Sequence, residues 1–404
     1  MASDSIVIVG GGHAAAALCA SLVDAGQGHR VELVCAEDVL PYQRPPLSKA
    51  FLKEAAEPLQ LHKDGSWFAA QGITVHQGDR VVEIKRDSKE VMLSSGRRVG
   101  YGHLVLATGT RARQHPELSV ALDNVFKLRN AADAQLLRHH LHTAAERELV
   151  VMGGGFIGLE VAATARQLNW SVHVLESASR LLARALSPEL SEFILQHHNA
   201  MGTVVDLGVS IGGFNVQGRT LTDIQVAGAP RKTSSLLLSI GAIPEVELAA
   251  QAGLQIDNGV YVDRQMRTSD QDILAIGDCT SFDYRGARIR LESVQNANDQ
   301  AKVAAATLIG SATDYQPTPW FWSEQGGLRL QMVGLWRPGL AVVPRAGTTP
   351  ASFSLFHYAG DELLAVESAN APVDHMWARK LIEAGRSPSF DLVADRDIPL
   401  KSLL

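Results

Sequence analysis

Near its N-terminus the chain reads Ser5-Ile-Val-Ile-Val-Gly-Gly-Gly-His-Ala-Ala-Ala-Ala-Leu-Cys-Ala20, and the rest of the chain is organised around this stretch. An apolar run is interrupted by glycines and followed by alanines, which predicts a buried strand that turns directly into a helix. Gly10, Gly12 and Ala15 fit the spacing G-x-G-x-x-G/A: the first glycine makes a tight turn, the second admits a pyrophosphate, and the small third residue lets helix pack on strand. The N–H groups of the helix N-terminus favour negative charge. The stretch therefore predicts a dinucleotide-binding βαβ unit.

A second unit of the same kind begins with Glu148-Leu-Val-Val-Met-Gly-Gly-Gly-Phe-Ile-Gly-Leu-Glu160. Here Gly153, Gly155 and Gly158 complete the full G-x-G-x-x-G spacing. A strand is predicted to end at Glu176, about twenty residues further on, where this fold places the acid that binds a ribose diol. Two such units indicate two dinucleotides and therefore favour an oxidoreductase that uses both.

The composition is that of a globular protein with several domains. The chain has 404 residues, of which 46% are hydrophobic, enough material for more than one core. Its formal net charge is −6 and its pI is near 6.2. Nucleic-acid-binding proteins normally carry a basic excess, so we expect no nucleic-acid partner.

The cysteines and the apolar segments bear on location. Cys19, Cys35 and Cys279 are scattered, without C-x-x-C or metal-ligand spacing, so we expect no disulfide and no metal site. The leader Met-Ala-Ser-Asp-Ser lacks positive charge, unlike a signal peptide. No segment approaches the roughly 20 apolar residues that span a bilayer. We therefore expect a cytoplasmic protein with no membrane partner.

Several polar residues are predicted at the sheet edge where open α/β folds bind ligands. Glu37, the nearest carboxylate after the second strand, would meet the adenosine ribose, with a solvated loop acid as the alternative. Asp278 ends another buried strand. The alanine-rich helix predicted over residues 292–309 begins near Val294, and its N-terminus would stabilise a second anion.

Two further segments shape the expected architecture. The strand predicted at 103–110 ends in small residues, as a backbone lying against a cofactor requires. From Pro317 the composition changes, which indicates a separate C-terminal α+β domain. There Trp320 and Trp322 would share one strand face opposite Phe321, so that one ring covers a cofactor while the other packs beneath it.

Together these pieces resemble the FAD- and NADH-dependent ferredoxin reductases of bacterial oxygenase systems, the putidaredoxin reductase and biphenyl dioxygenase ferredoxin reductase family. The resemblance covers essentially the whole chain. The motifs that carry it are Gly10-x-Gly12, Arg44-Pro-Pro-Leu-Ser-Lys49, Ala107-Thr-Gly109, Gly153-Gly-Gly-Phe-Ile-Gly-Leu-Glu160, Ile276-Gly-Asp278 and Trp320-Phe-Trp-Ser-Glu-Gln325.

The resemblance implies an α/β fold with two Rossmann-like dinucleotide-binding domains and a C-terminal α+β domain. The FAD-binding domain would comprise residues 1–110 and 245–316, split by an inserted NADH-binding domain at 111–244. The C-terminal domain would comprise residues 317–404.

The resemblance also assigns residues to the two nucleotides. FAD would be noncovalent and NADH would bind at the second glycine loop. The implied catalytic residues are Lys49 near the flavin ring, Glu160 facing the nicotinamide, and Trp320 and Trp322. The implied FAD contacts are Gly10, Gly12 and Ala14 on the pyrophosphate, Val81 and Arg129 on the adenine side, Asp278 on the ribityl chain, and Val294 at the isoalloxazine.

Two details of this assignment carry alternatives. The family often has an acid where this chain has Ala36, with Glu37 one place later, which puts the ribose contact in doubt but not FAD binding. Lys49 is expected to pair with Glu160, which would shift toward the nicotinamide when NADH arrives. A purely structural salt bridge is the alternative.

The implied activity is that of a flavoprotein reductase that accepts hydride from NADH onto FAD and passes single electrons to a small iron–sulfur ferredoxin or rubredoxin, and so indirectly to an oxygenase. A flavin disulfide reductase would need a close pair of cysteines, which the chain lacks. The alternative function is an NADH-sensing or partner-binding flavoprotein of the apoptosis-inducing-factor type.

The acidic carrier is expected to dock on a local basic patch. The candidate residues lie on or before the helix predicted over 292–309, and they are Arg285, Arg288, Arg290 and Lys302. A solvated charged loop is the alternative. Electrostatic steering through such a patch would weaken as salt screens it.

Overall fold

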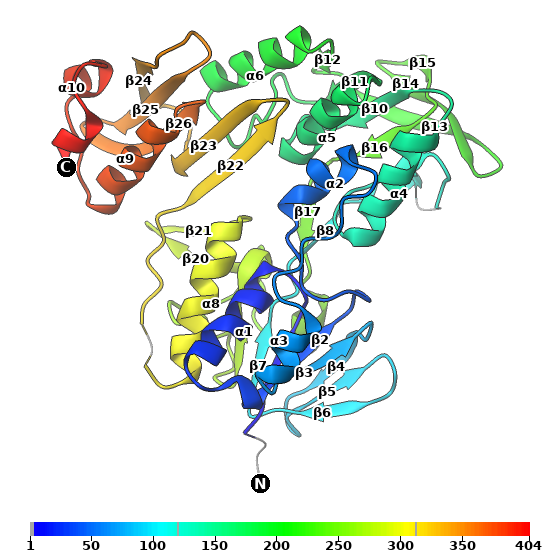
Figure 1. Cartoon of the computed structure of the whole chain (residues 1–404), viewed down its shortest axis with the longest axis vertical. Helices are drawn as coiled ribbons and strands as arrows, with labels where there is room; N and C mark the ends of the chain where they lie inside the picture. The colour runs from blue at the N-terminus through cyan, green and yellow to red at the C-terminus, as the bar shows by residue number, and fades with distance from the viewer. Residues whose placement is uncertain (1–3, 119–120, 312) are drawn as a thin grey trace. The chain divides into compact units, whose positions relative to one another are not determined.

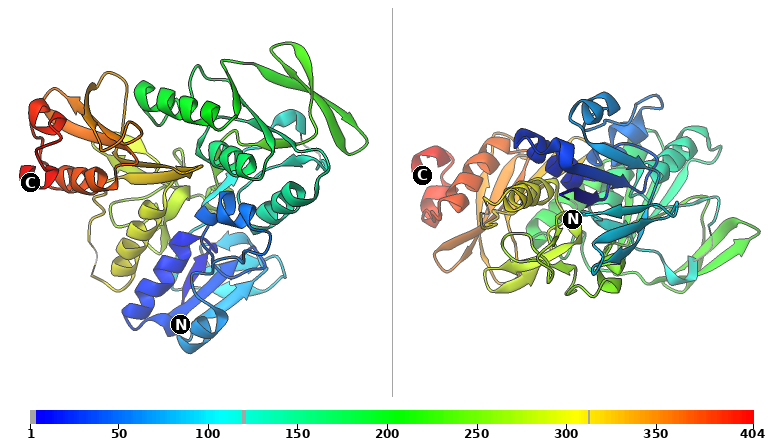
Figure 2. Two further views of the ribbon diagram at one scale, coloured as in Figure 1. Left: turned by 45° about the horizontal axis from the view of Figure 1, so that its top comes forward. Right: turned by 90° about the horizontal axis from the view of Figure 1, so that it is seen from below.

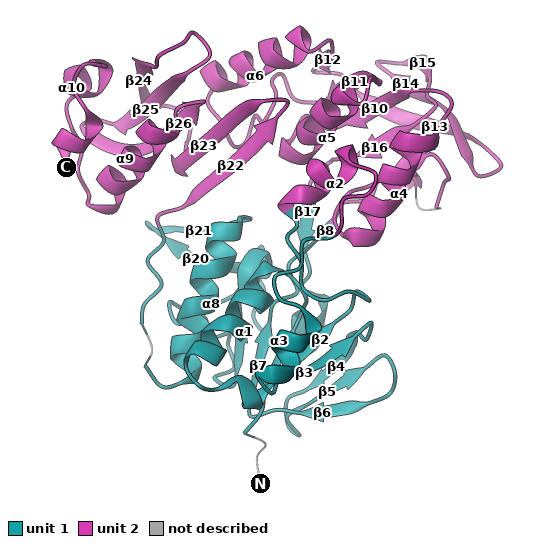
Figure 3. Cartoon of the chain, in the orientation of Figure 1, with its two compact units in different colours: residues 1–44, 59–111, 242–317 teal, residues 45–58, 112–241, 318–404 magenta. Residues whose placement is uncertain are grey.

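The structure is a computed structural model that describes residues 4–118, 121–311 and 313–404. The chain forms two compact units, each assembled from three segments (Figure 3). Unit 1 contains residues 1–44, 59–111 and 242–317, and unit 2 contains residues 45–58, 112–241 and 318–404. The first residues of the leader, Met-Ala-Ser, lie outside the described residues. Because the structure separates two units, the three domain boundaries stay a prediction.

Unit 1 is built on a five-stranded parallel sheet with the order β19-β7-β1-β2-β3, the arrangement typical of a dinucleotide-binding fold. The strands are β1 (Ile6–Val9), β2 (Val31–Cys35), β3 (Thr74–Gln77), β7 (His103–Leu106) and β19 (Ile273–Ala275). Strand β1 is buried along its whole length. This burial explains why it reads as a continuous apolar run rather than an alternating one.

The two long helices of unit 1, α1 (His13–Asp24) and α8 (Val294–Leu308), lie side by side (Figure 1 and Figure 2). Ala15, Leu18 and Leu22 of α1 are fully buried against the sheet. Smaller elements complete the unit: η1 (Gly28–Arg30), α3 (Gly65–Ala70), β4 (Val81–Lys85), β5 (Glu90–Leu93), β6 (Arg98–Gly100), β8 (Thr110–Ala112), β17 (Ala242–Pro244), α7 (Glu247–Gln251), β18 (Val260–Tyr261), η4 (Gly277–Cys279), β20 (Thr280–Tyr284) and β21 (Ala287–Ile289).

Unit 2 contains a second parallel sheet, with the order β12-β11-β10-β16-β9. Its strands are β9 (Val125–Phe126), β10 (Glu148–Met152), β11 (Ser171–Glu176), β12 (Val204–Leu207) and β16 (Leu236–Leu238). Its remaining elements are η2 (Pro45–Ser48), α2 (Ala50–Lys53), η3 (Pro116–Leu118), α4 (Ala131–Thr143), α5 (Phe156–Gln167), α6 (Pro188–Ala200), β13 (Ile211–Gln217), β14 (Thr220–Val226) and β15 (Ala229–Lys232).

The C-terminal part of unit 2 is an antiparallel sheet with the order β22-β23-β26-β25-β24 (Figure 1). Helix α9 (Pro372–Glu383) packs on β23 and β26. The strands are β22 (Trp320–Gln325), β23 (Leu328–Gly334), β24 (Ala341–Ala346), β25 (Phe353–Ala359) and β26 (Glu362–Ala369), followed after α9 by α10 (Phe390–Ala394) and η5 (Leu400–Leu403). The predicted fold class, two Rossmann-like cores and a C-terminal α+β part, is confirmed.

The first glycine of each loop makes the same close approach to a neighbouring strand. Gly10 has φ +131°, and a Cβ built there would lie 2.1 Å from the carbonyl oxygen of Ala107. Gly153 has φ +107°, and its Cβ would lie 2.3 Å from the carbonyl oxygen of Ser239. In both units, therefore, only glycine allows the loop to turn at this point.

One predicted strand is shorter than expected. The ladder over residues 103–110 stops at Leu106, and the chain resumes as β8 at Thr110. Gly109 lies between them with φ +68°, a left-handed conformation that no strand continues through. The small residues thus form a turn beyond the strand rather than its end.

Gly10→Ala is expected to lower the free energy of unfolding by about 2–5 kcal/mol. The cost of a positive φ in alanine adds to the cost of a clash between its Cβ and the carbonyl oxygen of Ala107. Bound FAD should fall in parallel. Urea denaturation and flavin absorbance measure the two effects. Gly96→Ala is the matched control, since Gly96 also has a positive φ (+86°) but nothing lies within 4 Å of a built Cβ. Its free energy of unfolding should fall by about 1 kcal/mol. Equal losses in the two variants would contradict the steric argument.

Candidate functional site

The helices that follow the two glycine loops begin without side-chain caps. Gly12 precedes α1 and Gly155 precedes α5, and neither N-cap makes a side-chain hydrogen bond. By contrast, α4, α6 and α8 are capped by side chains. A built Cβ at Gly155 meets nothing within 4 Å, and at Gly12 it meets only Nε of Arg44, at 3.9 Å. Neither end has a side-chain cap, and each has open space in front of it, which fits a pyrophosphate at each.

The structure brings several predicted FAD residues of unit 1 together. Ala14 and Ala15 lie in the first turn of α1, and Val294 is the first residue of α8. A Cβ built at Gly277 would lie 3.0 Å from Cβ of Ala14, so η4, which carries Asp278, contacts the start of α1. These residues come from distant parts of the sequence but lie at one edge of the sheet.

Glu37 and Val81 have different surroundings. The Glu37 carboxylate accepts hydrogen bonds from the Tyr42 hydroxyl (2.7 Å) and from Nη2 of Arg44 (2.9 Å). Ala36 follows β2 directly and is exposed. Val81 starts β4 and is buried. The ribose contact of Glu37 and the adenine contact of Val81 stay predictions.

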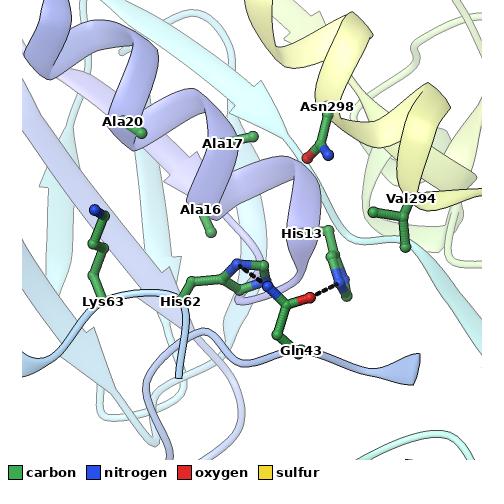
Figure 4. A pocket seen from close by; sticks show the side chains of 9 residues that line it. All are labelled: His13, Ala16, Ala17, Ala20, Gln43, His62, Lys63, Val294 and Asn298. Carbon is green, nitrogen blue, oxygen red and sulfur yellow. Dashed lines mark hydrogen bonds between the residues drawn. The ribbon is translucent and has the colours of Figure 1, made fainter. Parts of the chain in front are cut away.

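A pocket of about 200 Å³ lies between the starts of α1 and α8 (Figure 4). At its edge Gln43 bridges two histidines: its Oε1 accepts from Nε2 of His13 and its Nε2 donates to Nδ1 of His62, each at 3.1 Å (Figure 4). Burial lowers the pKa of His62. The pocket is smaller than the roughly 300–1,000 Å³ of most small-molecule sites, so it cannot hold a whole dinucleotide.

Glu160 is the most enclosed charged residue among the predicted catalytic residues. It lies on α5 and is 4% exposed. Its Oε2 accepts hydrogen bonds from Nζ of Lys49 and Oγ of Ser48, each at 2.5 Å, and its Oε1 accepts one from Oγ of Ser323 at 2.7 Å. The expected pairing of Lys49 with Glu160 is confirmed, whereas the nicotinamide contact stays a prediction.

The sequence reasoning missed Ser48 and Ser323 as partners of Glu160. Ser48 lies in the motif that pointed to Lys49, and Ser323 lies in the motif that pointed to Trp320 and Trp322. The alternation of side chains along β22 is the signal that predicts the position of Ser323. Alternation places Phe321, Ser323 and Gln325 on one face. The ring of Phe321 lies 4.6 Å from that of Phe156 on α5, so this face meets α5 and Glu160.

The tryptophans of β22 take the opposite face, as predicted. The ring centroids of Trp320 and Trp322 are 5.5 Å apart. Trp320 packs against the C-terminal core beside His375 and Arg379, and its ring centroid lies 5.4 Å from the Arg379 guanidinium carbon. Whether either ring covers the flavin stays a prediction.

Glu176 ends β11 beside the second glycine loop. Its Oε2 accepts a hydrogen bond from the N–H of Gly154 (2.6 Å), and its Oε1 accepts one from the N–H of Ala178 (2.7 Å). Arg180 is committed elsewhere: its guanidinium donates to the carbonyls of Leu186 and Ala183, both at 2.6 Å, and to Oγ of Ser191 at 2.7 Å. The carboxylate is thus oriented at the loop, and no free cation lies at Arg180 to bind a phosphate.

The remaining predicted residues have hydrogen-bond or ion-pair partners of their own. Arg129 stands just before α4 in unit 2, and its backbone N–H donates to Asp133. Arg288 pairs with Asp257 and Asp283, and Arg290 pairs with Glu292. Nζ of Lys302 lies 3.9 Å from Asp299. These acids offset much of the charge of the expected basic patch, whose docking role stays a prediction.

The three cysteines are free and buried. Burial raises the pKa of the Cys35 thiol to about 12 and also raises the pKa values of Cys19 and Cys279. Over residues 4–118, 121–311 and 313–404, no cluster of His, Cys, Asp and Glu could hold a metal ion. In the same ranges no helix is long and apolar enough to cross a membrane.

Residues 4–301 match the family model described as pyridine nucleotide-disulphide oxidoreductase, and residues 320–404 match the one described as reductase C-terminal. Rhodocoxin reductase of Rhodococcus erythropolis is 40% identical over 98% of this chain and 93% of its own length.

Two solved structures also cover nearly the whole chain. The ferredoxin reductase for the CYP199A2 system from Rhodopseudomonas palustris has a TM-score of 0.94 at 40% identity, covering 99% of both chains. The reductase in the covalent putidaredoxin reductase–putidaredoxin complex has a TM-score of 0.93 at 38% identity, covering 100% of this chain and 98% of the other.

Lowering the pH from 6.5 to 4 is expected to reduce the free energy of unfolding, partly through His198. Burial lowers the pKa of this histidine to about 4, so below pH 6.5 the unfolded state takes up a proton that the folded state does not. The loss attributable to His198 grows between these values and reaches at most about 3 kcal/mol. Urea denaturation at several pH values measures it. His198→Asn should flatten the dependence, whereas the exposed His29→Asn should not; identical slopes in both variants would contradict the argument.

Proposed function

The chain belongs to the pyridine nucleotide-disulphide oxidoreductase family, and we propose that it is an NADH-dependent ferredoxin reductase that binds FAD and passes single electrons to a small iron–sulfur carrier. One observation supports this most strongly. The chain pairs two uncapped glycine-loop helices, each fitted to a dinucleotide pyrophosphate, with no accessible thiol among its free cysteines. Electrons from NADH must therefore leave by a route other than a redox-active disulfide.

FAD, when bound, supplies the chemistry that links a two-electron donor to a one-electron acceptor. The protein binds the cofactor and orients it. Gly10, Gly12, Ala14 and Asp278 would hold FAD, with Val294 presenting a helix N-terminus to the flavin ring. Arg129 and Val81 would contact its adenine side.

The second loop and the buried pair would hold NADH. Gly153, Gly155 and Gly158 would receive its pyrophosphate and Glu176 its ribose diol. Lys49 and Glu160 neutralise each other in the described structure, so movement of the carboxylate toward the nicotinamide would free the lysine cation. Because Trp320 packs against the C-terminal core, Trp322 is the ring we assign to the flavin.

The carrier would be a ferredoxin or a rubredoxin that feeds an oxygenase. The relatives' names and the putidaredoxin complex support this partner class. The domain boundaries 1–110 with 245–316, 111–244 and 317–404 belong to the same proposal. Three free, buried cysteines support a cytoplasmic location, where thiols stay reduced.

NADH added anaerobically is expected to bleach the flavin, and an oxidised iron–sulfur carrier should restore its colour. The second-order rate with an acidic carrier should fall as salt rises, because screening weakens steering. Stopped-flow absorbance from about 0.02 to 0.5 M salt measures this. Bleaching without reoxidation by any ferredoxin or rubredoxin would favour the NADH-sensing alternative.

NADH is expected to exceed NADPH by about ten- to a hundredfold in kcat/KM, because Glu176 loses hydrogen bonds to, and repels, a 2′-phosphate. Glu176→Ala should remove most of this preference. Steady-state rates with both nucleotides measure it. Arg180→Lys serves as the control, since Arg180 binds carbonyls and should not alter the ratio. An unchanged preference in Glu176→Ala would place the specificity elsewhere.

A further inference from the structure

A line of buried polar side chains leads from Glu160 into the interior of unit 2. Oγ of Ser323 lies 2.7 Å from Oε1 of Glu160, Nε2 of Gln325 lies 3.1 Å from Oγ of Ser323, and Nε2 of His198 lies 2.9 Å from Oε1 of Gln325. Ser323, Gln325 and His198 are each 0% exposed. Burying three polar side chains is costly unless each bond in the line is made.

The hydrogens in this line all point toward Glu160. A carboxylate only accepts, so the Ser323 hydroxyl must donate its single hydrogen to Oε1. The serine oxygen can then only accept from the Gln325 NH₂ group. That orientation turns the amide oxygen toward His198, which donates from Nε2.

The far end of the line is a neutral histidine. Burial lowers the pKa of His198 to about 4; the bond to Gln325 opposes this shift, and the neighbouring His197 adds to it. The structure describes no hydrogen-bond partner for its Nδ1. A neutral ring with its proton on Nε2 donates to Gln325 and needs no donor at Nδ1. The direction of donation is therefore set at one end by the histidine and at the other by the Glu160 carboxylate.

The two carboxylate oxygens of Glu160 accept hydrogen bonds from different parts of the chain. Oε2 accepts from Lys49 and Ser48, which come from the segment 45–58. Oε1 receives only Ser323 among the described residues, from a strand of the C-terminal sheet. If the carboxylate turns toward the nicotinamide and releases Lys49, the bond from Ser323 to Oε1 remains and sets the orientation of the carboxylate.

We propose that His198, Gln325 and Ser323 are positioning residues: they form a one-directional hydrogen-bond relay that fixes the Glu160 carboxylate for the nicotinamide. This inference rests on the proposed function and deepens it. The relay gives the C-terminal strand β22 a direct part in the nucleotide site. It also explains why a glutamine, with one donor and one acceptor, stands at position 325.

Gln325→Glu tests the direction of the relay with almost no change in shape. When ionised, the new side chain still accepts from His198 but cannot donate to Ser323, and it competes with Glu160 for the single hydrogen of the serine hydroxyl. Gln325→Met removes both bonds yet leaves the hydroxyl free to serve Glu160. The relay therefore predicts that the glutamate variant is slower, whereas a purely structural role predicts that the methionine variant, which strands His198, is the more damaged.

The holoenzyme variants are compared by three measurements. The rate of flavin reduction at saturating NADH should fall about tenfold in Gln325→Glu and about threefold in Gln325→Met, the sizes of a charge-assisted and a neutral hydrogen bond. The NAD⁺ dissociation constant from calorimetry should change less than about twofold in both, because the glycine loop and Glu176 are untouched. Urea denaturation should show Gln325→Met to be the less stable variant.

Ser323→Ala keeps the test decisive if Gln325→Glu fails to fold. Reduction should again slow about tenfold with NAD⁺ affinity retained. Ser354→Ala removes an equally buried serine of the same sheet, one that bonds Ser368 at 2.9 Å, and should reduce at the wild-type rate. Equal reduction rates in Ser323→Ala and Ser354→Ala, or a slower Gln325→Met than Gln325→Glu, would overturn the relay. A wild-type flavin that NADH does not reduce would overturn the proposed function instead.

Discussion

The close approach of a glycine to the carbonyl of the next strand is the constraint on which both nucleotide loops depend. At Gly10 and Gly153 any side chain would collide with the carbonyl oxygen of Ala107 or Ser239. That contact holds the loop close to the sheet and aims the start of the helix at the strand ends. Glycine is also the N-cap of α1 and of α5, so neither helix has a side-chain cap and each N-terminus can bind a pyrophosphate.

A second constraint is the burial of the Glu160 carboxylate. Removing a charge from water costs several kcal/mol unless its lone pairs are filled, and here the donors come from two segments distant in sequence from Glu160. Lys49 and Ser48 supply one oxygen, and Ser323 supplies the other. The pair is therefore both a structural bond of unit 2 and a group whose charge can be released by motion of one partner.

Much of the fold could be predicted from the sequence, because its signals are local. The apolar runs before Gly10 and Gly153 predicted the first strand of each parallel sheet. The glycine spacing and the residues after it predicted the loop and the helix that follow each strand. The strand predicted at 103–110 was too long, since the left-handed turn at Gly109 depends on contacts from outside the segment. The site was predicted in part: Lys49 and Glu160 were paired correctly through family resemblance, but Ser48, Ser323 and His198 were missed.

By itself the sequence determined the two dinucleotide loops, the terminal acid Glu176 and the alternation of β22, because each is set by neighbours within a few residues. Only the tertiary structure decided what those residues contact. It turned the Arg180 guanidinium toward the carbonyls of Leu186 and Ala183, and it paired Arg288 with acids. It also aligned Glu160 and His198 with Ser323 and Gln325 of β22, which come from three stretches far apart in sequence. Such a line depends on how α5, α6 and β22 pack, and packing is a long-range property that local patterns do not record.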